Sequence, residues 1–488
     1  MGRISLFNWL IALGAGTLGT LAFAPYNLWP LAVTSLSLWM WLSIRTPGFL
    51  TGFFYGLGLF GSGISWVSVS MVEHGGASLG LAFGMTFIFT AGLAIFPGLA
   101  SLGHAVWRNQ WPGPFRQICL LTACWVTMEV FRSWVLTGFP WLLFGYSTLL
   151  SPFEGYLSWI GVYGTTTFMA LASGGIVTAA ITRKVLPLLI PIFIIGVGSA
   201  LNSIFSPFHQ PELITRFTLW QPVIPQATKG KPEYQNKILA LHVSEGLSQD
   251  ASIMIWPETA LPITESQLNS VLPDLEMMLL TKNQTLITGI LGQKDGRYTN
   301  RLITLGLGHG TYDKTRLVPF GEYVPLESIL RGIITFFDLP MSHIIPGDQE
   351  NLLIHKSVRI APLICYEIAY TTKTRRLAKQ ANIILTVSND TWFGNSIGPH
   401  QHLQIAQIRA RELGKPVIRA TNDGLTAFID ANGRVQSSLS RFERGTLTYN
   451  VIPANTITPY SQAGEVPLVI LLIIILAASR KIDVEIRV

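Results

Sequence analysis

The feature that most constrains the fold is a series of long apolar stretches in the first 205 residues. Only ten charged side chains occur there, whereas about a quarter of the residues in a typical soluble domain are charged. The stretches between these charges reach the roughly 20 residues that an α-helix needs to cross a bilayer. The sequence therefore predicts a polytopic α-helical membrane domain over residues 1–206, with seven spans, and an eighth span near the carboxyl end. The predicted spans are 4–24, 29–44, 49–70, 78–102, 117–137, 156–180, 185–205 and 464–479.

The basic residues around these spans predict their orientation. Lys and Arg favour cytoplasmic loops, and here they recur after every second span. If all of them face the cytoplasm, both chain ends lie there and the segment between the seventh and eighth spans lies on the outer face. The same bias accounts for much of the net charge of +7, so no nucleic-acid partner is predicted. The residues that form the pattern are Arg3, Arg45, Arg108, Arg116, Arg183, Lys184, Arg480 and Lys481.

Two local patterns in the apolar half allow further predictions. The first 24 residues resemble a secretory signal, with a basic start and a small-x-small ending. Their apolar part is long and more spans follow, so we expect an uncleaved first helix. The glycine-rich runs from Gly56 to Gly63 and from Gly75 to Gly84 predict close helix packing, because small residues let two backbones approach.

An aromatic cluster follows the fifth predicted span and has two interpretations. Its members are Trp134, Phe139, Trp141, Phe144 and Tyr146. An interfacial aromatic belt explains them without any substrate, and we favour it. The alternative is contact with a lipid substrate, with Trp141, Phe144 and Tyr146 as the candidates.

Residues 207–460 have the pattern of a separate, water-soluble α/β domain, and 461–488 would hold the last span and a cytoplasmic tail. Several apolar, β-branched runs such as 358–364 and 381–388 end in polar clusters, as buried strands do. Helices are expected over 232–247 and 399–413. Asn432-Gly433 predicts the turn of a β-hairpin. A domain of this size can bury its own hydrophobic core.

Polar residues follow the predicted strands of this domain. Glu258, Cys365 and Asn389 each lie at or just beyond the end of an apolar run, and Lys314 lies in a loop after another. The carboxyl ends of strands are where α/β sheets collect reactive side chains. We therefore expect these four segments to meet at one edge of the domain.

A thiol, a carboxylate and an ammonium at one edge are sufficient for acyl transfer. A cysteine attacks as thiolate, a glutamate can take its proton and return it to a leaving group, and a lysine can stabilise an oxyanion. The chain has three cysteines. Cys119 and Cys124 lie in the fifth predicted span, where packing is their expected role, whereas Cys365 lies among ionisable groups. Spacing alone does not select the partners of Cys365.

The local motifs do select them. The segments IWPETALP around Glu258, YDKTRLVPFGEYVP around Lys314 and LICYE around Cys365 resemble the three signature segments of the nitrilase, or carbon–nitrogen hydrolase, superfamily. With the membrane half, and with SNDTWFG and TGFPWLLFGYS, the chain resembles the membrane-embedded branch of that superfamily, the apolipoprotein N-acyltransferases. The resemblance spans nearly the whole chain and implies an extracytoplasmic αββα sandwich.

The resemblance also implies roles for individual residues. Glu258 would be the general base, Lys314 the electrostatic stabiliser and Cys365 the nucleophile. Glu322 would be an additional glutamate that holds Lys314 in register. Tyr366 and Glu367 match positions that are important in the family, and the Tyr366 N–H would contribute to an oxyanion hole. The chain departs from the family after IPQ, where it has ATKGKP in place of a bulky aromatic residue.

Further candidates follow the strand that ends at Ser388. Asn389, Asp390, Trp392 and Phe393 are expected to shape an acyl pocket, with simple packing as the alternative. His400 and His402 are spaced i, i+2 at the start of a helix and have no evident third ligand, so we expect structural histidines and no metal. No cofactor is implied.

The implied activity is the last step of bacterial lipoprotein maturation at the inner membrane. A phospholipid, with phosphatidylethanolamine expected, would acylate Cys365. The acyl chain would then pass to the amino terminus of a diacylglyceryl-modified apolipoprotein. The catalytic domain would face the periplasm, and a monomer suffices. Two alternatives stay open from sequence: a membrane-anchored amidase or hydrolase of the nitrilase type, and a non-catalytic protein that binds or transports lipid.

Overall fold

The computed structural model describes residues 3–205, 207, 213–248, 250–319, 321–323 and 344–480. The predicted tail beyond Arg480, including Lys481, lies outside these residues. The chain forms two compact units. The helical unit comprises Met1–Ser68, Gly80–Phe205 and Gln462–Val488, and the α/β unit comprises Val69–Leu79 and Ser206–Ser461.

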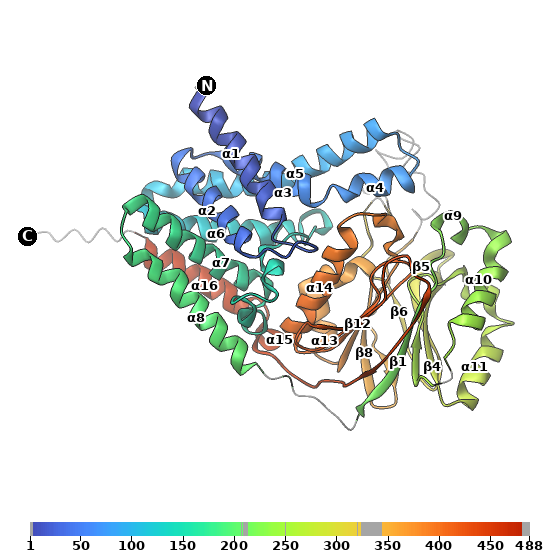
Figure 1. Cartoon of the computed structure of the whole chain (residues 1–488). Helices are drawn as coiled ribbons and strands as arrows, with labels where there is room; N and C mark the ends of the chain where they lie inside the picture. Colours follow the sequence, from blue (N-terminus) through green and yellow to red (C-terminus); the bar gives the residue numbers. More distant parts are fainter. Residues whose placement is uncertain are drawn as a thin grey trace, which may run out of the picture. The chain divides into compact units, whose positions relative to one another are not determined.

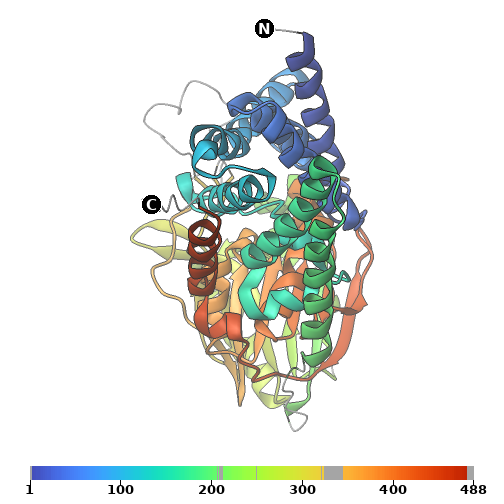
Figure 2. The same cartoon turned by 90° about the vertical axis from the view of Figure 1, so that its left-hand side faces the viewer.

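The helical unit consists of apolar helices that coincide with the predicted spans (Figure 1). Helix α16, from the end of the chain, returns to pack against α6 and α7 (Figure 2). Among the described residues, three helical segments are long and apolar enough to cross a membrane, or four if the bent pair α3 and α4 counts as one span. The full set of eight crossings stays a prediction. The helices are α1 (Arg3–Thr20), α2 (Pro30–Arg45), α3 (Phe49–Gly63), α4 (Trp66–Glu73), α5 (Leu79–Trp107), α6 (Pro114–Arg132), α7 (Leu157–Thr182), α8 (Leu189–Ile204) and α16 (Val466–Ser479).

The predicted span 49–70 is not one continuous helix. Helix α3 ends at Gly63 and α4 begins at Trp66. The sequence Gly61-Ser62-Gly63 explains the break, because glycine has low helix propensity and Gly/Ser pairs are frequent kink sites. The predicted span over 49–70 thus falls on a bent pair of helices.

Glycines allow helices α1 and α3 to pack closely. A Cβ added to Gly16 would lie 2.0 Å from the Tyr55 carbonyl oxygen, and one added to Gly58 would lie 2.0 Å from the Leu13 carbonyl oxygen. Close packing was predicted correctly for the run from Gly56. It was wrong for Gly80 and Gly84, where an added Cβ would meet none of the described atoms within 4 Å.

The α/β unit is a sandwich of two mixed sheets. The first sheet has the strand order β13-β1-β2-β4-β5-β6, with β3 paired to β4, and the second has the order β12-β11-β10-β9-β8-β7. In the first sheet β2 is parallel to β1 and β4, and in the second β9 is parallel to β8 and β10. The strands of the first sheet are β1 (Thr215–Gln221), β2 (Ile253–Ile255), β3 (Leu261–Thr264), β4 (Thr285–Lys294), β5 (Arg297–Gly306), β6 (Thr311–Asp313) and β13 (Gly445–Val451). Those of the second are β7 (Leu353–His355), β8 (Val358–Ile364), β9 (Ile383–Ser388), β10 (Val417–Thr421), β11 (Ala427–Ile429) and β12 (Val435–Ser438).

The core lies between the two sheets, where side chains such as Phe217 and Ile255 of the first face Ile360 and Leu385 of the second. Helices cover the outer faces, which completes the predicted αββα arrangement (Figure 1). The central strands are buried on both sides, as their continuous apolar runs predicted. The first sheet is covered by α10 (Pro232–Glu245) and α11 (Leu272–Thr281), and the second by α13 (Thr371–Ala378) and α14 (Gly398–Leu413).

Candidate active site

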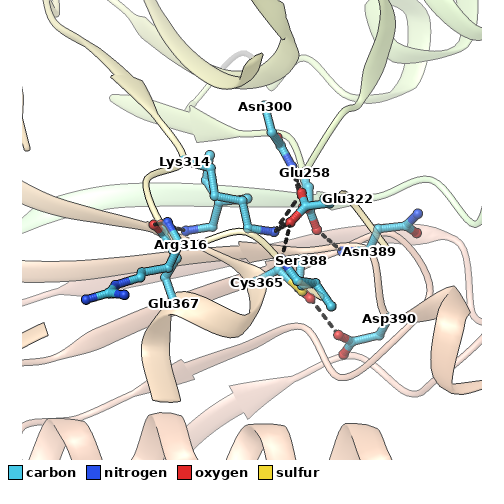
Figure 3. Close-up of polar contacts among 12 residues, drawn as sticks. Glu258, Asn300, Lys314, Arg316, Glu322, Cys365, Glu367, Ser388, Asn389 and Asp390 are labelled. Carbon is cyan, nitrogen blue, oxygen red and sulfur yellow. Dashed lines mark hydrogen bonds and ion pairs between the residues drawn. The ribbon is translucent and has the colours of Figure 1, made fainter. Parts of the chain in front are cut away.

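Cys365 lies at the sharp turn that ends strand β8. It is the first residue of the short helix η9 (Cys365–Ala369), and its φ of 56° is in the left-handed region that side chains other than glycine rarely adopt. Strain of this kind persists only where the surroundings enforce it. The turn brings the partly exposed thiol toward Glu258 and Lys314, as Figure 3 shows.

Lys314 follows strand β6 and is held between two carboxylates. Its Nζ lies 2.9 Å from a carboxylate oxygen of Glu322 and 3.4 Å from Oε1 of Glu258. All three side chains are at least nine-tenths buried. A buried ammonium between two buried carboxylates avoids the large cost of an unpaired charge, so the three groups form one network.

Asn300 of strand β5 completes this network and was missed by sequence reasoning. Its Nδ2 donates to Oε1 of Glu258 at 2.7 Å and to Oε1 of Glu322 at 3.1 Å. An amide is the one neutral side chain that can donate two protons to two acceptors in this way. No motif marks Asn300, and its place in the polar first half of strand β5 gives no signal that separates it from its neighbours.

The carboxylate of Glu258 is also tied to the second sheet. The Asn389 N–H donates to its Oε2 at 2.8 Å, so Asn389, predicted as a pocket residue, contacts the candidate base through its main chain. Two residues of helix α9 (Gln226–Lys229) support the pair. Lys229 Nζ donates to the Glu258 carbonyl at 3.0 Å, and Gln226 Oε1 accepts from the Asn389 side chain at 2.8 Å. Lys229 lies in the ATKGKP segment, where the chain departs from the family pattern, and Gln226 is the residue just before that segment.

Glu367 joins the loop of Lys314 to the loop of Cys365. Its side chain is wholly buried. Oε1 accepts the N–H groups of Thr315 at 2.9 Å and Arg316 at 3.0 Å, and Oε2 accepts the Ile364 N–H at 2.9 Å. One carboxylate thus fixes the residues that follow Lys314 and the residue that precedes Cys365. Glu367 is a positioning residue.

The electrostatics of the site favour a resting thiol and a permanent ammonium. Burial raises the pKa of Cys365 to about 12, and the Glu258 carboxylate acts in the same direction against the opposing effect of Lys314. Burial alone would lower the pKa of Lys314, but the carboxylates of Glu322 and Glu258 outweigh it and raise that pKa. The thiol therefore needs a base to ionise, and the lysine is always a cation.

The remaining predicted pocket residues have different surroundings. Asp390 is buried and paired with Arg419, 2.6 Å from its Nη2. Phe393 is buried, and the partly exposed Trp392 packs against His74, with ring centroids 5.1 Å apart. Tyr366 is buried and packs edge-on against Tyr370. Contacts of these residues with substrate stay predictions.

The aromatic cluster of the helical unit is largely internal. Trp141, Phe144 and Tyr146 are at most 1% exposed. Phe144 packs against Trp125 with ring centroids 5.7 Å apart. An interfacial belt is therefore the wrong interpretation for these three, although Trp134, which is 60% exposed, is consistent with it.

The two histidines of helix α14 do not form a metal site with their neighbours. Within the described residues, no group of three His, Cys, Asp or Glu side chains is placed to hold a metal ion. The ring of His402 lies beneath the candidate nucleophile, with Nε2 3.2 Å from the Cys365 carbonyl oxygen. His402 is thus a structural partner of Cys365.

Comparison with known proteins assigns both halves of the chain. Residues 15–175 match the model of the apolipoprotein N-acyltransferase N-terminal domain, and residues 224–460 match that of carbon-nitrogen hydrolases. Proteins named apolipoprotein N-acyltransferase from Photobacterium profundum and Pseudomonas aeruginosa are 39% and 41% identical to this chain, over 95% and 94% of its length and 93% of theirs. The chain belongs to the apolipoprotein N-acyltransferase family.

Membership of the apolipoprotein N-acyltransferase family confirms the resemblance inferred from the motifs around Glu258, Lys314 and Cys365. Among solved structures, a CN-hydrolase superfamily protein from Xanthomonas campestris matches with 17% identity and a TM-score of 0.36, over 54% of this chain and 97% of its own. The family assignment rests on the full-length relatives, which cover both the helical unit and the α/β unit.

Proposed function

We propose that this protein transfers an acyl chain from a membrane phospholipid to the amino terminus of a diacylglyceryl-modified apolipoprotein, through a thioester on Cys365. The observation that carries the proposal is the shared ammonium of Lys314. It lies between Glu258 and Glu322 and acts on the thiol of Cys365. A base, a cation and a nucleophile are thus collected from two sheets into one buried network.

In the first half-reaction the Cys365 sulfur attacks the ester carbonyl of the phospholipid. Glu258 takes the thiol proton. Its Oε2 accepts one hydrogen bond, from Asn389, and so keeps a lone pair for that proton. The C–O bond of the ester breaks, and the proton passes from Glu258 to the departing lysophospholipid oxygen. The products are the thioester and a lysophospholipid, with no oxidant, metal or cofactor involved.

In the second half-reaction the neutral amine of the apolipoprotein attacks the thioester carbonyl. A C–N bond forms and the C–S bond breaks. Glu258 accepts a proton from the nitrogen and returns it to sulfur, which regenerates the thiol. In both halves the negative charge that develops on the carbonyl oxygen is stabilised by Lys314, together with the Tyr366 N–H in an oxyanion hole.

The buried charges of the site suit this chemistry. Lys314 is 1% exposed and Glu258 is 7% exposed. In such a water-poor setting an ammonium stabilises an oxyanion more strongly than it would in water. Exclusion of water also protects the thioester from hydrolysis, which separates an acyltransferase from a hydrolase.

The lipid substrates account for the helical unit. Both the donor, with phosphatidylethanolamine as the proposed headgroup, and the acceptor carry acyl chains that stay in hydrocarbon. We place the protein in the bacterial inner membrane as a monomer with eight spans, with both termini in the cytoplasm and the α/β unit on the periplasmic face. The even number of predicted spans and the distribution of Lys and Arg support this orientation.

Reconstitution tests the proposal. The purified full chain in detergent–phospholipid micelles is incubated with a diacylglyceryl lipopeptide whose amino terminus is free. The expected products are an N-acylated lipopeptide and lysophospholipid in equal amounts, and Cys365→Ala gives neither. Free fatty acid without amide would identify a hydrolase instead. Unchanged phospholipid and lipopeptide would favour a non-catalytic lipid-binding protein.

A further inference from the structure

A buried polar cluster lies on the side of Cys365 opposite Lys314 and has no part in the mechanism above. It is built on the second sheet from Ser388 at the end of β9, Asp390 in the turn that follows, His402 of α14 and Arg419 of β10. All four side chains are at most 2% exposed. Figure 3 shows Ser388 and Asp390 beneath the thiol.

The side chain of Ser388 lies against both Cys365 and Asp390. Ile364 pairs with Val387 in the parallel strands β8 and β9. The next residues, Cys365 and Ser388, are therefore neighbours, and Figure 3 shows the Ser388 side chain beside the sulfur. The Ser388 Oγ donates to Oδ1 of Asp390 at 2.7 Å. A hydroxyl has one proton and two acceptor lone pairs. While the Ser388 hydroxyl donates its only proton to Asp390, it can only accept from Cys365. The thiol is therefore the donor to the serine oxygen.

Asp390 is held as an ionised acceptor. Burial alone would raise the pKa of its carboxyl, but Arg419 and the neighbouring His402 and Ser388 together outweigh burial and hold that pKa far below its usual range. Nη2 of Arg419 lies 2.6 Å from Oδ2 of Asp390. The carboxylate therefore has no proton to give, and it orients the Ser388 hydroxyl by accepting from it.

His402 fixes the main chain of the nucleophile. Its Nε2 lies 3.2 Å from the Cys365 carbonyl oxygen, which can only accept, so Nε2 carries the proton. Burial lowers the pKa of His402, which favours the neutral ring and leaves Nδ1 to accept from Nη2 of Arg419 at 3.1 Å. Arg419 thus anchors the groups that hold both the thiol and the strained backbone of Cys365.

We propose that Ser388 is the hydroxyl that orients the Cys365 thiol and then turns from Asp390 to donate to the sulfur when it becomes a thiolate. The inference rests on the proposed role of Cys365. As Glu258 removes the thiol proton, the bond from sulfur to the Ser388 oxygen is lost. The Ser388 O–H then rotates from Asp390 Oδ1 to the sulfur, and Arg419 retains the carboxylate. The rotation reverses once the thioester has formed and the sulfur is neutral.

The consequence is a Cys365 thiolate that Lys314 stabilises from one side and Ser388 from the other. Ionisable groups from each element around the site act on Cys365: Glu258 from beyond β2, Lys314 from beyond β6 and Asp390 from beyond β9, with neutral His402 of α14 at its carbonyl. Ser388 is the neutral group that would donate a hydrogen bond to the sulfur itself. Hydrogen bonds to a charged acceptor are about twice as strong as neutral ones, so loss of this donor should raise the pKa of Cys365.

The test is the pH profile of Cys365 alkylation. The full chain in detergent is treated with iodoacetamide, and the modified Cys365 peptide is quantified by mass spectrometry, which separates it from Cys119 and Cys124. Only the thiolate reacts. Ser388→Ala is expected to shift the profile upward by about one pH unit, or to slow alkylation about tenfold at fixed lower pH. Ser388→Thr, which restores a hydroxyl, should return the profile toward that of the unmodified chain.

Thr386→Val is the matched control. Thr386 is a wholly buried residue of the same strand, two positions earlier, whose hydroxyl has no hydrogen-bond partner among the described residues. Its replacement removes a hydroxyl of the same kind and should leave the profile unchanged. If Ser388→Ala and the unmodified chain have the same profile, the inference about Ser388 is overturned and the proposed function stands. If Cys365 resists alkylation at every pH in the unmodified chain, both are overturned.

Discussion

The two sheets of the α/β unit contribute different things to the site. The first sheet supplies Glu258, Asn300 and Lys314, whose side chains are joined by direct hydrogen bonds. The second supplies Cys365, and its other polar groups act mostly on position: Ser388 on the thiol, His402 on the carbonyl and Glu367 on two loops. In the proposed mechanism the first sheet carries the proton and the cation, and the second holds the nucleophile in a strained turn.

This division teaches how a hydrophobic sandwich can assemble an ionic site. Each sheet alone presents an incomplete set of groups at its edge. The Asn389 N–H crosses from the second sheet to Glu258, and Glu367 crosses to the loop of Lys314. The core between the sheets therefore fixes the distance between the base and the nucleophile. Substitutions on the first sheet should remove a reacting group, and those on the second should displace the reacting groups from their positions.

The largest effect is expected for Glu258→Gln. The amide keeps the shape of the side chain but cannot take the thiol proton, so N-acylation of lipopeptide should fall by about 10²- to 10⁴-fold. The amide also replaces one of two acceptor oxygens, which face Asn300 Nδ2 and the Asn389 N–H, so a loss of about 1–3 kcal/mol in the free energy of unfolding should accompany the loss of activity. Activity is therefore measured on chromatographically monodisperse, folded protein. Glu265→Gln, a half-exposed carboxylate just after β3 that is paired with Arg301, is the control and should retain activity. Full activity of Glu258→Gln would contradict the catalytic role proposed for the first sheet.

An intermediate effect is expected for Glu367→Gln. The new amide replaces one acceptor oxygen by a donor, so main-chain N–H groups of the Lys314 or Cys365 loop lose their partner. We expect a rate loss of about 10- to 100-fold and a loss of about 1–3 kcal/mol in the free energy of unfolding. Activity and thermal inactivation are measured together. Glu350→Gln, which removes another carboxylate in contact with Lys373, should cost less in rate; an equal cost would mean that charge and not loop position matters.

The smallest effect is expected for Asp423, which follows β10. This prediction tests how the buried carboxyl groups of Asp423 and Asp390 differ. Unlike Oδ1 of Asp390, Oδ1 of Asp423 has no partner among the described residues, and burial raises the pKa of its carboxyl to about 6. The unfolded chain releases this proton near pH 3.8. The folded state is therefore penalised progressively as pH rises from about 4 to about 6.

Asp423→Asn should accordingly stabilise the protein at pH 7.5, by at most about 3 kcal/mol, and make no difference near pH 4. The half-life of thermal inactivation at the two pH values measures this. A variant that is less stable at pH 7.5 would show that the Asp423 charge is favourable where it lies.

The sequence predicted the sandwich well because its signals are local. Strand β9 follows from a continuous apolar run and ends at Ser388, where that run ends, and helix α14 ends at Leu413 as predicted. The hairpin of β11 and β12 formed around Asn432-Gly433 as expected. The helices of the other unit matched the apolar stretches for the same reason, except at Gly63, where local helix breakers were overlooked in a strongly hydrophobic run.

The supporting residues could not be predicted, because their roles depend on contacts between distant segments. Asn300 is 42 positions from Glu258 along the chain, and Arg419 is 29 positions from Asp390. Asp390 was assigned to a substrate pocket because it follows the end of a predicted strand, and only the pairing of β9 with β10 places it beside an arginine. Motifs predicted the proposed reacting groups, whereas the residues that hold them depend on tertiary packing.

The most direct test of the account is the identity of the acylated residue. The full chain is incubated with phospholipid in the absence of lipopeptide, and its intact mass and peptides are measured. The account predicts one added acyl chain, located on Cys365, released by neutral hydroxylamine and transferred to lipopeptide when that is supplied. Acylation of a different residue, or N-acylation of lipopeptide by a chain whose Cys365 never carries the acyl group, would contradict it.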